Sequence, residues 1–340
     1  MSPKYLIKIN DHWHFRLSIK FIQYMYPIKS ITRRNFVKKT ALTAGLMALG
    51  SEAIIGKSFM AAASNIANGH TSGHSTIVAH GGLSADAHAI ISQSSLEEEY
   101  RSRFNVLLQS GWQEIFADSG RDDWRKKWFL DGETARVENS PDGMTIHAGP
   151  VAQRETDHAV LWTKEVFEAD NLKIEYNFTR IDNSIVNVGT VNIIYILAQG
   201  GNGKPADILE WADERRSPNM EKYYNFMHAY HVSYAVSQPP SSPPEQDRYI
   251  RGRRYSASGL NGTELTPEYM NVPLFEQGAT YQMTFIKAGR ELFLHVEGNG
   301  KDRVFYFDAS GFGPITKGRI GLRQMYTRVS RYSDFRFSSF

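Results

Sequence analysis

Residues 226–234 read FMHAYHVSY and hold two histidines, two tyrosines and a serine without any glycine or proline. Aromatic and β-branched residues favour strands. Successive side chains of a strand face opposite ways, so His231 and Ser233 share one face while Tyr230 and Tyr234 share the other. The stretch predicts a strand with one face in a core. The other face either takes part in a buried hydrogen-bond network or forms the floor of a ligand-binding groove.

Short apolar or alternating runs separated by turn residues continue on both sides of this stretch. Turn dipeptides such as Asp142-Gly143 and Ala288-Gly289 are typical of hairpins. About ten strands predict an all-β fold, a two-sheet antiparallel jelly-roll (concanavalin-like) sandwich. The expected strands are 144–147, 159–162, 172–178, 188–198, 226–236, 281–287, 292–297, 303–308, 318–325 and 333–337.

Two long insertions interrupt the strand pattern, at 200–222 and 237–273. Loops of this length in a compact sandwich are usually functional or disordered. A helix is expected before the sandwich, because Ser95-Leu96-Glu97-Glu98 forms a capping box. Its apolar stripe at 96, 100, 104, 107 and 108 predicts that the helix packs outside the main domain and ends near Leu108.

The N-terminal region has the features of an export leader. Arg33 and Arg34 form a twin-arginine motif, a short apolar run follows at 41–49, and Ala61-Ala62-Ala63 offers a cleavage site. We therefore expect a twin-arginine signal peptide over 1–63, translated from Met1 or Met25, and a periplasmic or secreted product. The apolar run is too short to span a bilayer, and the chain has no cysteine for a lipid anchor or disulfide.

The domain organisation predicted from composition has three parts: the leader, a flexible linker over 64–95 and one sandwich domain over 96–340. Four histidines in the linker lack the partners that a metal site needs, so no metal and no cofactor are predicted. Without the leader the chain holds 29 Lys/Arg and 34 Asp/Glu, a net charge of about −5. Nucleic-acid binding therefore loses its electrostatic support, and the basic segment after residue 247 is the part expected to meet an anion.

Several familiar hydrolytic sites are missing from the sequence. The paired carboxylates of sandwich glycosidases, the G-x-S-x-G elbow of serine hydrolases and acidic metal loops do not occur. The sequence instead offers His, Tyr and Arg, a set that suits β-elimination at a uronic acid. Arginine can stabilise the charge that accumulates on the carboxylate, while His or Tyr transfers protons. The leaving group, a sugar or water, is left open, so the enzyme would be a polysaccharide lyase or an oligosaccharide dehydratase.

Three segments carry a family resemblance: HAVLW at 158–162, YHVSY at 230–234 and GRIGLRQM at 318–325. In that order they resemble the YesU-like family of concanavalin-like jelly-roll proteins, linked to acidic-polysaccharide breakdown, over about 122–337. Some similar proteins look like ulvan oligosaccharide dehydratases. The resemblance implies functional positions and matches a basic site more loosely at Arg253 and Arg254. The implied positions are His158, Trp162, His231, Ser233, Arg323 and Gln324.

The roles expected for these residues follow from elimination chemistry. His231 is the proposed proton-transfer residue, with His158 or Tyr234 as partner, although strand parity argues against Tyr234. Arg323 and Arg254 are expected to hold the substrate carboxylate. We also expect His158, Trp162 and His231 on neighbouring strands of one sheet.

Two other functions remain open at this stage. In a non-catalytic carbohydrate-binding module, Trp162 and tyrosines would stack on sugar rings of an acidic saccharide. In a purely structural sandwich, both histidines would be buried and satisfied.

Overall fold

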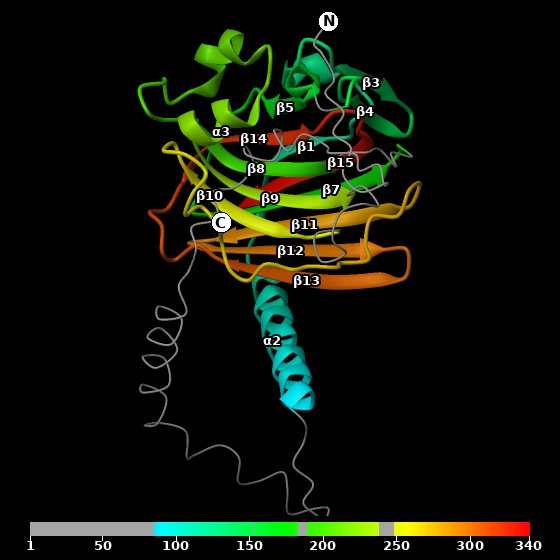
Figure 1. Ribbon diagram of the computed structural model, residues 1–340, viewed down its shortest axis with the longest axis vertical. Coiled ribbons are helices and arrows are strands. Elements are labelled where there is room, and N and C mark those ends of the chain that lie inside the picture. Colours follow the sequence, from blue (N-terminus) through cyan, green and yellow to red (C-terminus); the bar gives the residue numbers. More distant parts are fainter. Residues whose placement is uncertain (1–84, 153, 183–188, 238–247) are drawn as a thin grey trace, which may run out of the picture. The chain divides into compact units, whose positions relative to one another are not determined.

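A computed structural model describes residues 85–152, 154–182, 189–237 and 248–340. The predicted leader and most of the predicted linker lie outside these residues. The described chain forms a two-sheet antiparallel sandwich, as predicted (Figure 1). Every strand pair in it is antiparallel.

The eight-stranded sheet has the order β13-β12-β11-β7-β15-β4-β3, with β1 also paired to β15. Its long strands coincide with the predicted runs, whereas β1 and β3 were not expected from the sequence. The strands are β1 (Gln113–Asp118), β3 (Arg136–Ser140), β4 (Gly143–His147), β7 (Asn171–Arg180), β11 (Thr280–Ala288), β12 (Glu291–Gly298), β13 (Lys301–Asp308) and β15 (Val329–Ser339).

The seven-stranded sheet has the order β10-β9-β8-β14-β5-β2, with β6 paired to β14. The predicted strand around FMHAYHVSY is β9, which lies second from one edge. The predicted insertion 237–273 contains an additional strand, β10, that completes this edge. The strands are β2 (Trp128–Asp131), β5 (Ala159–Thr163), β6 (Phe167–Glu168), β8 (Thr190–Gly200), β9 (Met227–Ser237), β10 (Arg251–Ser256) and β14 (Lys317–Gln324).

Residues 201–226, here called the β8–β9 excursion, form a helical connection rather than a tight hairpin. The excursion contains the 3-10 helix η3 (Ile208–Arg215) and the helix α3 (Met220–Phe226). Asp207 and Asn219 cap these two helices by accepting hydrogen bonds from the backbone N–H two residues on. Two shorter 3-10 helices lie elsewhere, η1 (Trp124–Lys126) and η2 (Glu155–Asp157).

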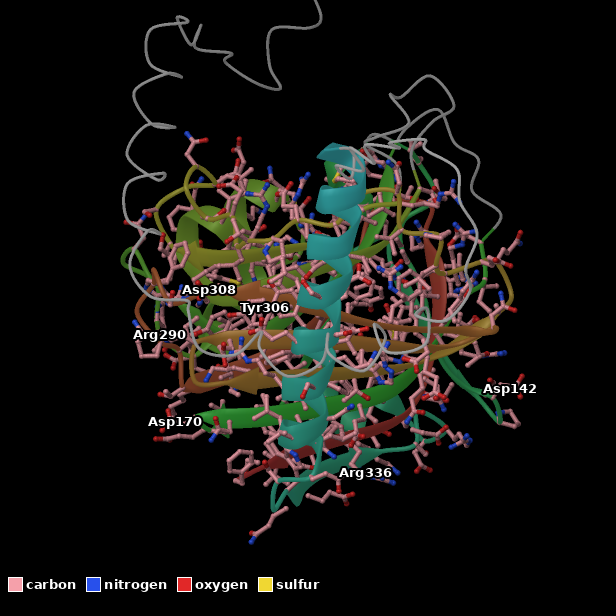
Figure 2. The ribbon with its side chains drawn as sticks, turned by 90° about the horizontal axis from the view of Figure 1, so that it is seen from below. Asp142, Asp170, Arg290, Tyr306, Asp308 and Arg336 are labelled. Carbon is pink, nitrogen blue, oxygen red and sulfur yellow. The ribbon has the colours of Figure 1, made fainter. Side chains whose placement is uncertain are left out.

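The helix α2 (Ala85–Leu108) corrects the predicted boundary between linker and domain. It ends where expected but begins ten residues before Ser95, because no glycine or proline interrupts the sequence from 85 to 108. Phe104 packs against Phe293 and Val304 of the eight-stranded sheet, and Arg101 forms an ion pair with Asp302 at 2.9 Å. Figure 2 shows α2 crossing the orange strands β11–β13 beside Tyr306.

The main core lies between the two sheets and is rich in aromatic residues. Tyr176 on β7 and Tyr234 on β9 meet across it, with their hydroxyls 3.0 Å apart. Apolar burial at about 25 cal/mol per Å² makes this layer the main source of stability. A second cluster of buried residues covers the outer face of the seven-stranded sheet, where Trp211 and Tyr223 of the excursion pack on Trp162 and Tyr195.

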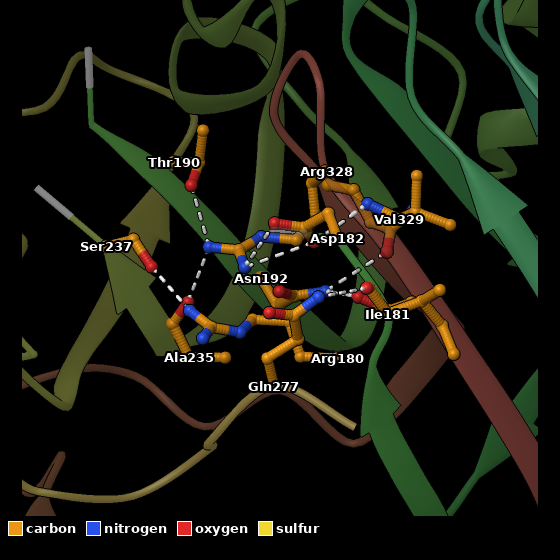
Figure 3. A network of polar contacts seen from close by, with 12 residues as sticks. Arg180, Ile181, Asp182, Thr190, Asn192, Ala235, Ser237, Gln277, Arg328 and Val329 are labelled. Atoms are coloured by element: carbon orange, nitrogen blue, oxygen red, sulfur yellow. Dashed lines mark hydrogen bonds and ion pairs between the residues drawn. The ribbon is translucent and has the colours of Figure 1, made fainter. Parts of the chain in front are cut away.

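A polar network joins the strand ends at one end of the sandwich (Figure 3). Arg328 is fully buried and donates to Thr190 Oγ1 and to the carbonyl of Ala235, each at 2.7 Å, while it pairs with Asp182 at 3.3 Å. Arg180 donates to Ser237 Oγ at 2.7 Å. The network therefore fixes the last described residue of β9 and the residues flanking 183–188.

Candidate functional site

The outer face of the seven-stranded sheet carries the polar residues that strand parity predicted. Along β9, Tyr230, Val232 and Tyr234 belong to the core between the sheets, whereas His231 and Ser233 face outward. The same alternation turns Arg323 of β14 outward, because its neighbour Leu322 is in the core. The face that looked functional in the sequence is therefore the face turned away from the sandwich interior.

Five side chains on this face form what we call the outer-face cluster. Each comes from a different strand or strand end, so the cluster crosses the sheet from β10 to the start of β5. Its members contact their neighbours in turn and are all nearly or fully buried. They are Tyr255, His231, Tyr195, Arg323 and His158.

Arg323 is the electrostatic centre of the cluster. It is fully buried, and none of the described carboxylates pairs with it. Its guanidinium donates to Tyr195 Oη at 3.3 Å and to His158 Nδ1 at 2.5 Å, while Nε has no acceptor among the described residues. Burying an unpaired cation costs several kcal/mol. The arrangement suits an anion that would supply the missing charge.

His158 is held in one tautomer by Arg323. Because a guanidinium only donates hydrogen bonds, Nδ1 of His158 must accept, and the proton of the neutral ring then resides on Nε2. Burial and the Arg323 charge lower the pKa of His158 to about 2, so the ring is neutral at physiological pH. Its buried Nε2–H has no partner in the described chain. His158 and Arg323 thus each retain one buried N–H donor without a described acceptor.

His231 lies at the other side of the cluster with both ring nitrogens engaged. Nδ1 is 2.7 Å from Tyr255 Oη, and Nε2 is 2.7 Å from Ser233 Oγ. Burial, with the charges of Arg253, Arg323 and Arg251, lowers the pKa of His231 well below its ordinary value. Burial raises the pKa of Tyr255 well above its ordinary value, so this pair is uncharged near neutral pH.

Tyr195 joins the two halves of the cluster. Its hydroxyl accepts a hydrogen bond from the guanidinium of Arg323 at 3.3 Å, and its ring lies 6.0 Å from that of Tyr255 between centroids. Burial raises the pKa of Tyr195, and the neighbouring Arg323 charge opposes that effect. Tyr195 pairs directly with His231 in the strand register, and its ring stacks on Trp162 at 5.3 Å. A continuous polar path therefore runs from Ser233 to His158.

Trp162 is a fully buried wall of the cluster and offers no exposed platform for a sugar ring. Its ring lies over Gly321, where an added Cβ would come within 2.4 Å of it. Its Nε1 donates at 2.8 Å to Asp131, which also pairs with Arg215 at 2.6 Å and accepts from the Tyr223 hydroxyl at 3.3 Å. Asp131 thereby ties the wall of the cluster to the β8–β9 excursion.

The β8–β9 excursion covers the outer-face cluster. Tyr223 lies 5.2 Å from the Arg323 guanidinium and its ring stacks on Tyr195. The excursion is also fastened at its start, where Asp207 pairs with Arg319 at 2.6 Å. A ligand could reach Arg323 only if this cover were displaced.

The structure separates some residues that the sequence had grouped together. Tyr234 faces the sandwich interior, as parity indicated, so its expected partnership with His231 is wrong. Gln324 also faces inward and bonds Asn192 and the carbonyl of Ile146. Arg254 faces the opposite side of β10 from His231, next to the Tyr230 ring at 5.5 Å, and does not join Arg323.

Arg253 does lie on the His231 face, at the rim of the cluster. It pairs with His231 in the strand register and forms an ion pair with Glu264 at 2.7 Å. Its charge is therefore already compensated. Of the expected cations, Arg323 alone combines a position in the cluster with the lack of a described carboxylate partner.

His158 and His231 share a face but are not on neighbouring strands, which corrects the expected geometry. Strands β14 and β8 lie between β5 and β9. At about 4.8 Å per strand step, three steps put the two rings on the order of 14 Å apart. They are too distant to act on the same sugar carbon pair, so they cannot be an acid–base couple.

Tyr195, Tyr223 and Asp131 are site residues to which the sequence analysis gave no role. Tyr195 sits in an almost continuous apolar run, IIYILA, where nothing marks it as more than core. Its partnership with His231 depends on the register between β8 and β9, which local sequence does not reveal. Asp131 ends a short strand that the pattern did not detect.

The described part of the chain has no group of three or more His, Cys, Asp or Glu side chains arranged to hold a metal ion. None of its helices has the length and apolar character needed to cross a membrane.

Comparison with known proteins places the sandwich in a family without an assigned activity. Residues 119–337 match the family described as "Domain of unknown function (DUF1961)". The chain is 25% identical over 216 residues to the uncharacterized protein YesU of Bacillus subtilis (strain 168), covering 62% of this chain and 88% of YesU.

A solved structure of the same sandwich fold supports the fold assignment. A Bacillus subtilis protein of unknown function with a galectin-like fold superposes with a TM-score of 0.51 at 21% identity, covering 67% of this chain and 99% of that protein. The exoplasmic/lumenal domain of VIP36, crystallised with Ca²⁺ and Man3GlcNAc, gives 0.44 at 9% identity and covers 67% and 90%.

Proposed function

We propose that this chain, which belongs to the DUF1961 family, binds the carboxylate of a uronic acid in an acidic saccharide and catalyses β-elimination there. The proposal rests on the outer-face cluster, because the fold alone assigns no reaction in this family. The observation that carries the proposal is the buried Arg323 guanidinium without a described carboxylate partner. A bound uronate would remove the cost of that buried charge. Arginine also matches a carboxylate in bidentate geometry.

The donors beside Arg323 suit the charge that develops during elimination. Loss of the proton next to a carboxylate places negative charge on the carboxylate oxygens in the transition state. Preorganised N–H donors in a buried site stabilise such charge strongly. Arg323 Nε–H and His158 Nε2–H are buried donors without described acceptors. His158 is accordingly assigned to the carboxylate rather than to proton transfer.

A saccharide is favoured over other carboxylates by the aromatic residues around the guanidinium. Tyr195 lies beside it on the sheet, and Tyr223 lies over it on the β8–β9 excursion that would have to be displaced. Such side chains can contact the C–H faces of a sugar ring while their polar groups bind hydroxyls. The resemblance to proteins of acidic-polysaccharide breakdown, including ulvan pathways, points in the same direction. The same chemistry serves whether the leaving group is a sugar or a hydroxyl.

Purified protein incubated with a panel of uronic-acid oligosaccharides tests the reaction. Elimination produces a conjugated 4,5-unsaturated uronate whose ultraviolet absorbance rises with time. Arg323→Met should abolish both binding and turnover, and methyl-esterified substrate should be much poorer. The matched control is Arg331→Met, because Arg331 pairs with Asp142 on the other sheet and should leave turnover unchanged. Folding of both variants is compared by thermal unfolding. Near-normal turnover of folded Arg323→Met would overturn the proposal.

A non-catalytic binding module is the second candidate, favoured by the mutual hydrogen bonds within the cluster. Ser233, His231, Tyr255 and Tyr195 already satisfy one another in a buried chain, as in a structural network. In that case calorimetry would detect binding of acidic saccharides that depends on Arg323, with no product from any member of the panel.

A further inference from the structure

We infer that Tyr195 is the catalytic base of the proposed elimination, and that Tyr255 and His231 act behind it as a proton relay. This inference rests on the proposed function and changes the role that the sequence suggested for His231. Three steps support it: the position of the reacting proton, the state of the rival groups, and the connection of Tyr195 to a proton acceptor.

The position of the reacting proton follows from the substrate's own covalent structure. In a uronic acid the carbon that loses its proton, C5, is bonded directly to the carboxyl carbon. A base must therefore lie next to the group that holds the carboxylate. Tyr195 Oη is 3.3 Å from Arg323 Nη1. His231 has no hydrogen bond to Arg323 among the described contacts and reaches it only through the tyrosines.

The rival groups near Arg323 are poorly suited to accept a proton. His158 Nδ1 already accepts from Arg323, and its other nitrogen carries a proton. The Tyr223 hydroxyl donates to Asp131 at 3.3 Å, and burial together with that carboxylate raises the pKa of Tyr223 well above its ordinary value. Tyr195 differs because its hydroxyl accepts a hydrogen bond from Arg323 at 3.3 Å and, among the described contacts, is not engaged with a carboxylate.

The connection to an acceptor runs across two further strands. The rings of Tyr195 and Tyr255 lie 6.0 Å apart between centroids, and Tyr255 Oη is 2.7 Å from His231 Nδ1. Ser233 Oγ holds the opposite nitrogen of the ring at 2.7 Å. Loss of the phenolic proton of Tyr195 can thus be matched by transfer from Tyr255 to His231. His231 Nδ1, which lies 2.7 Å from the Tyr255 hydroxyl, is the atom placed to receive it.

The proposed step balances without any co-reactant. The C5–H bond breaks and its proton goes to Tyr195 Oη, while the proton of Tyr195 moves to Tyr255 and that of Tyr255 to His231 Nδ1. The electron pair forms the C4=C5 double bond, and the C4–O bond breaks. The leaving oxygen takes a proton from water, and His231 returns its proton to solvent by way of the same chain.

Three variants test the order of the relay: Tyr195→Phe, Tyr255→Phe and His231→Asn. Tyr195→Phe should lower kcat by about 10³-fold while binding of an acidic oligosaccharide changes less than threefold. Tyr255→Phe and His231→Asn should lose less, about 10- to 100-fold, and shift the pH profile of kcat. Tyr306→Phe, on the other sheet and outside the cluster, is the matched control and should keep wild-type turnover.

A second readout separates proton removal from departure of the leaving group. Uptake of deuterium from heavy water at C5 of unreacted substrate should fall in Tyr195→Phe in parallel with turnover. If Tyr195→Phe does not fold, fluorotyrosine at position 195 should move the pH profile of kcat/KM to lower pH, because fluorine lowers the phenol pKa.

The outcomes are distinguishable from those of the proposed function. No product from the wild-type protein with any acidic saccharide would remove the proposed function itself. An active wild type with a Tyr195→Phe variant that retains turnover, and with an inactive His231→Asn variant, would overturn only the present inference and return the base to His231. An unchanged pH profile in the fluorotyrosine protein would likewise overturn it.

Discussion

At the scale of single residues, side-chain direction could be predicted from sequence but side-chain partners could not. Alternation along residues 226–234 correctly placed His231 and Ser233 opposite Tyr234. The same rule separates Arg253 from Arg254 and Arg323 from Gln324. Side-chain partners depend on the register between paired strands, so the pairing of Tyr195 with His231 could not be predicted from the sequence. The missing counter-charge of Arg323 is likewise a property of the folded arrangement.

Gly321 is predicted to be required for the wall of the cluster. An added Cβ would lie 2.4 Å from the fully buried Trp162 ring, which cannot move without disturbing Asp131. Gly321→Ala should reduce the free energy of unfolding by about 1–3 kcal/mol through overpacking. Urea titration checks this, with Gly311→Ala as control because an added Cβ there meets nothing within 4 Å. Equal stability of the two variants would contradict the packing described.

The buried histidines predict how stability depends on pH. The folded state lowers the pKa of His158 to about 2 and that of His231 well below 6.5, so the unfolded chain binds more protons. The contribution of the two histidines to the free energy of unfolding is complete above about pH 6.5. It is lost progressively as the pH falls below that value.

Each histidine should contribute a slope of about 1.4 kcal/mol per pH unit in this acidic range. Urea unfolding of the wild type at pH 7, 6 and 5 measures the total slope. His158→Asn and His231→Asn should each flatten it. A variant with the wild-type slope would show that its histidine is not held neutral by burial.

At the scale of elements, long strands and hairpin turns were predictable because alternation and turn chemistry are local signals. The predicted runs correspond to β4, β5, β7–β9 and β11–β15. Short strands such as β2 and β6 carry too few residues to show a period. Strand β10, RGRRYS, fell within the predicted insertion 237–273, because its charged sequence does not reveal the pairing with β9 that makes it a strand. The excursion was identified as an insertion, but its helices and its cover over the cluster were not.

The buried pair of Asp131 and Arg215 is predicted to hold the excursion on the sheet. Both residues are almost fully buried, and their closest atoms are 2.6 Å apart. Asp131→Asn should cost about 3–5 kcal/mol of unfolding free energy, because it leaves the Arg215 charge uncompensated. It should also expose residues 201–226 to limited proteolysis before the sandwich is cut.

The control for this pair is an exposed one on the other sheet. Glu114→Gln removes the partner of Arg336, whose ion pair at 3.1 Å is solvent-exposed, and should cost less than about 1 kcal/mol. Proteolysis of Asp131→Asn that begins elsewhere than in the excursion would show that the pair has no such fastening role.

At the scale of the whole molecule, the sequence predicts a chain made for export. Arg33 and Arg34 precede the apolar run 41–49 and the cleavage site at 61–63, all outside the described residues. Replacement of both arginines by lysine should leave an uncleaved precursor in the cytoplasm, whereas the natural sequence should yield a product that begins after Ala63. Cell fractionation with N-terminal sequencing measures both. Efficient export of the lysine variant would rule out the twin-arginine route.

The Arg328 network has a consequence for how this protein family can diversify. Arg328, Asp182 and Thr190 are joined by side-chain contacts, and Arg180 holds Ser237, so described contacts link the strand ends next to residues 183–188 and 238–247. Insertions, deletions or grafted peptides between these anchors would leave the sandwich register intact. Natural variation and library design can therefore both act at this end of the sandwich without changing the residues of the outer-face cluster.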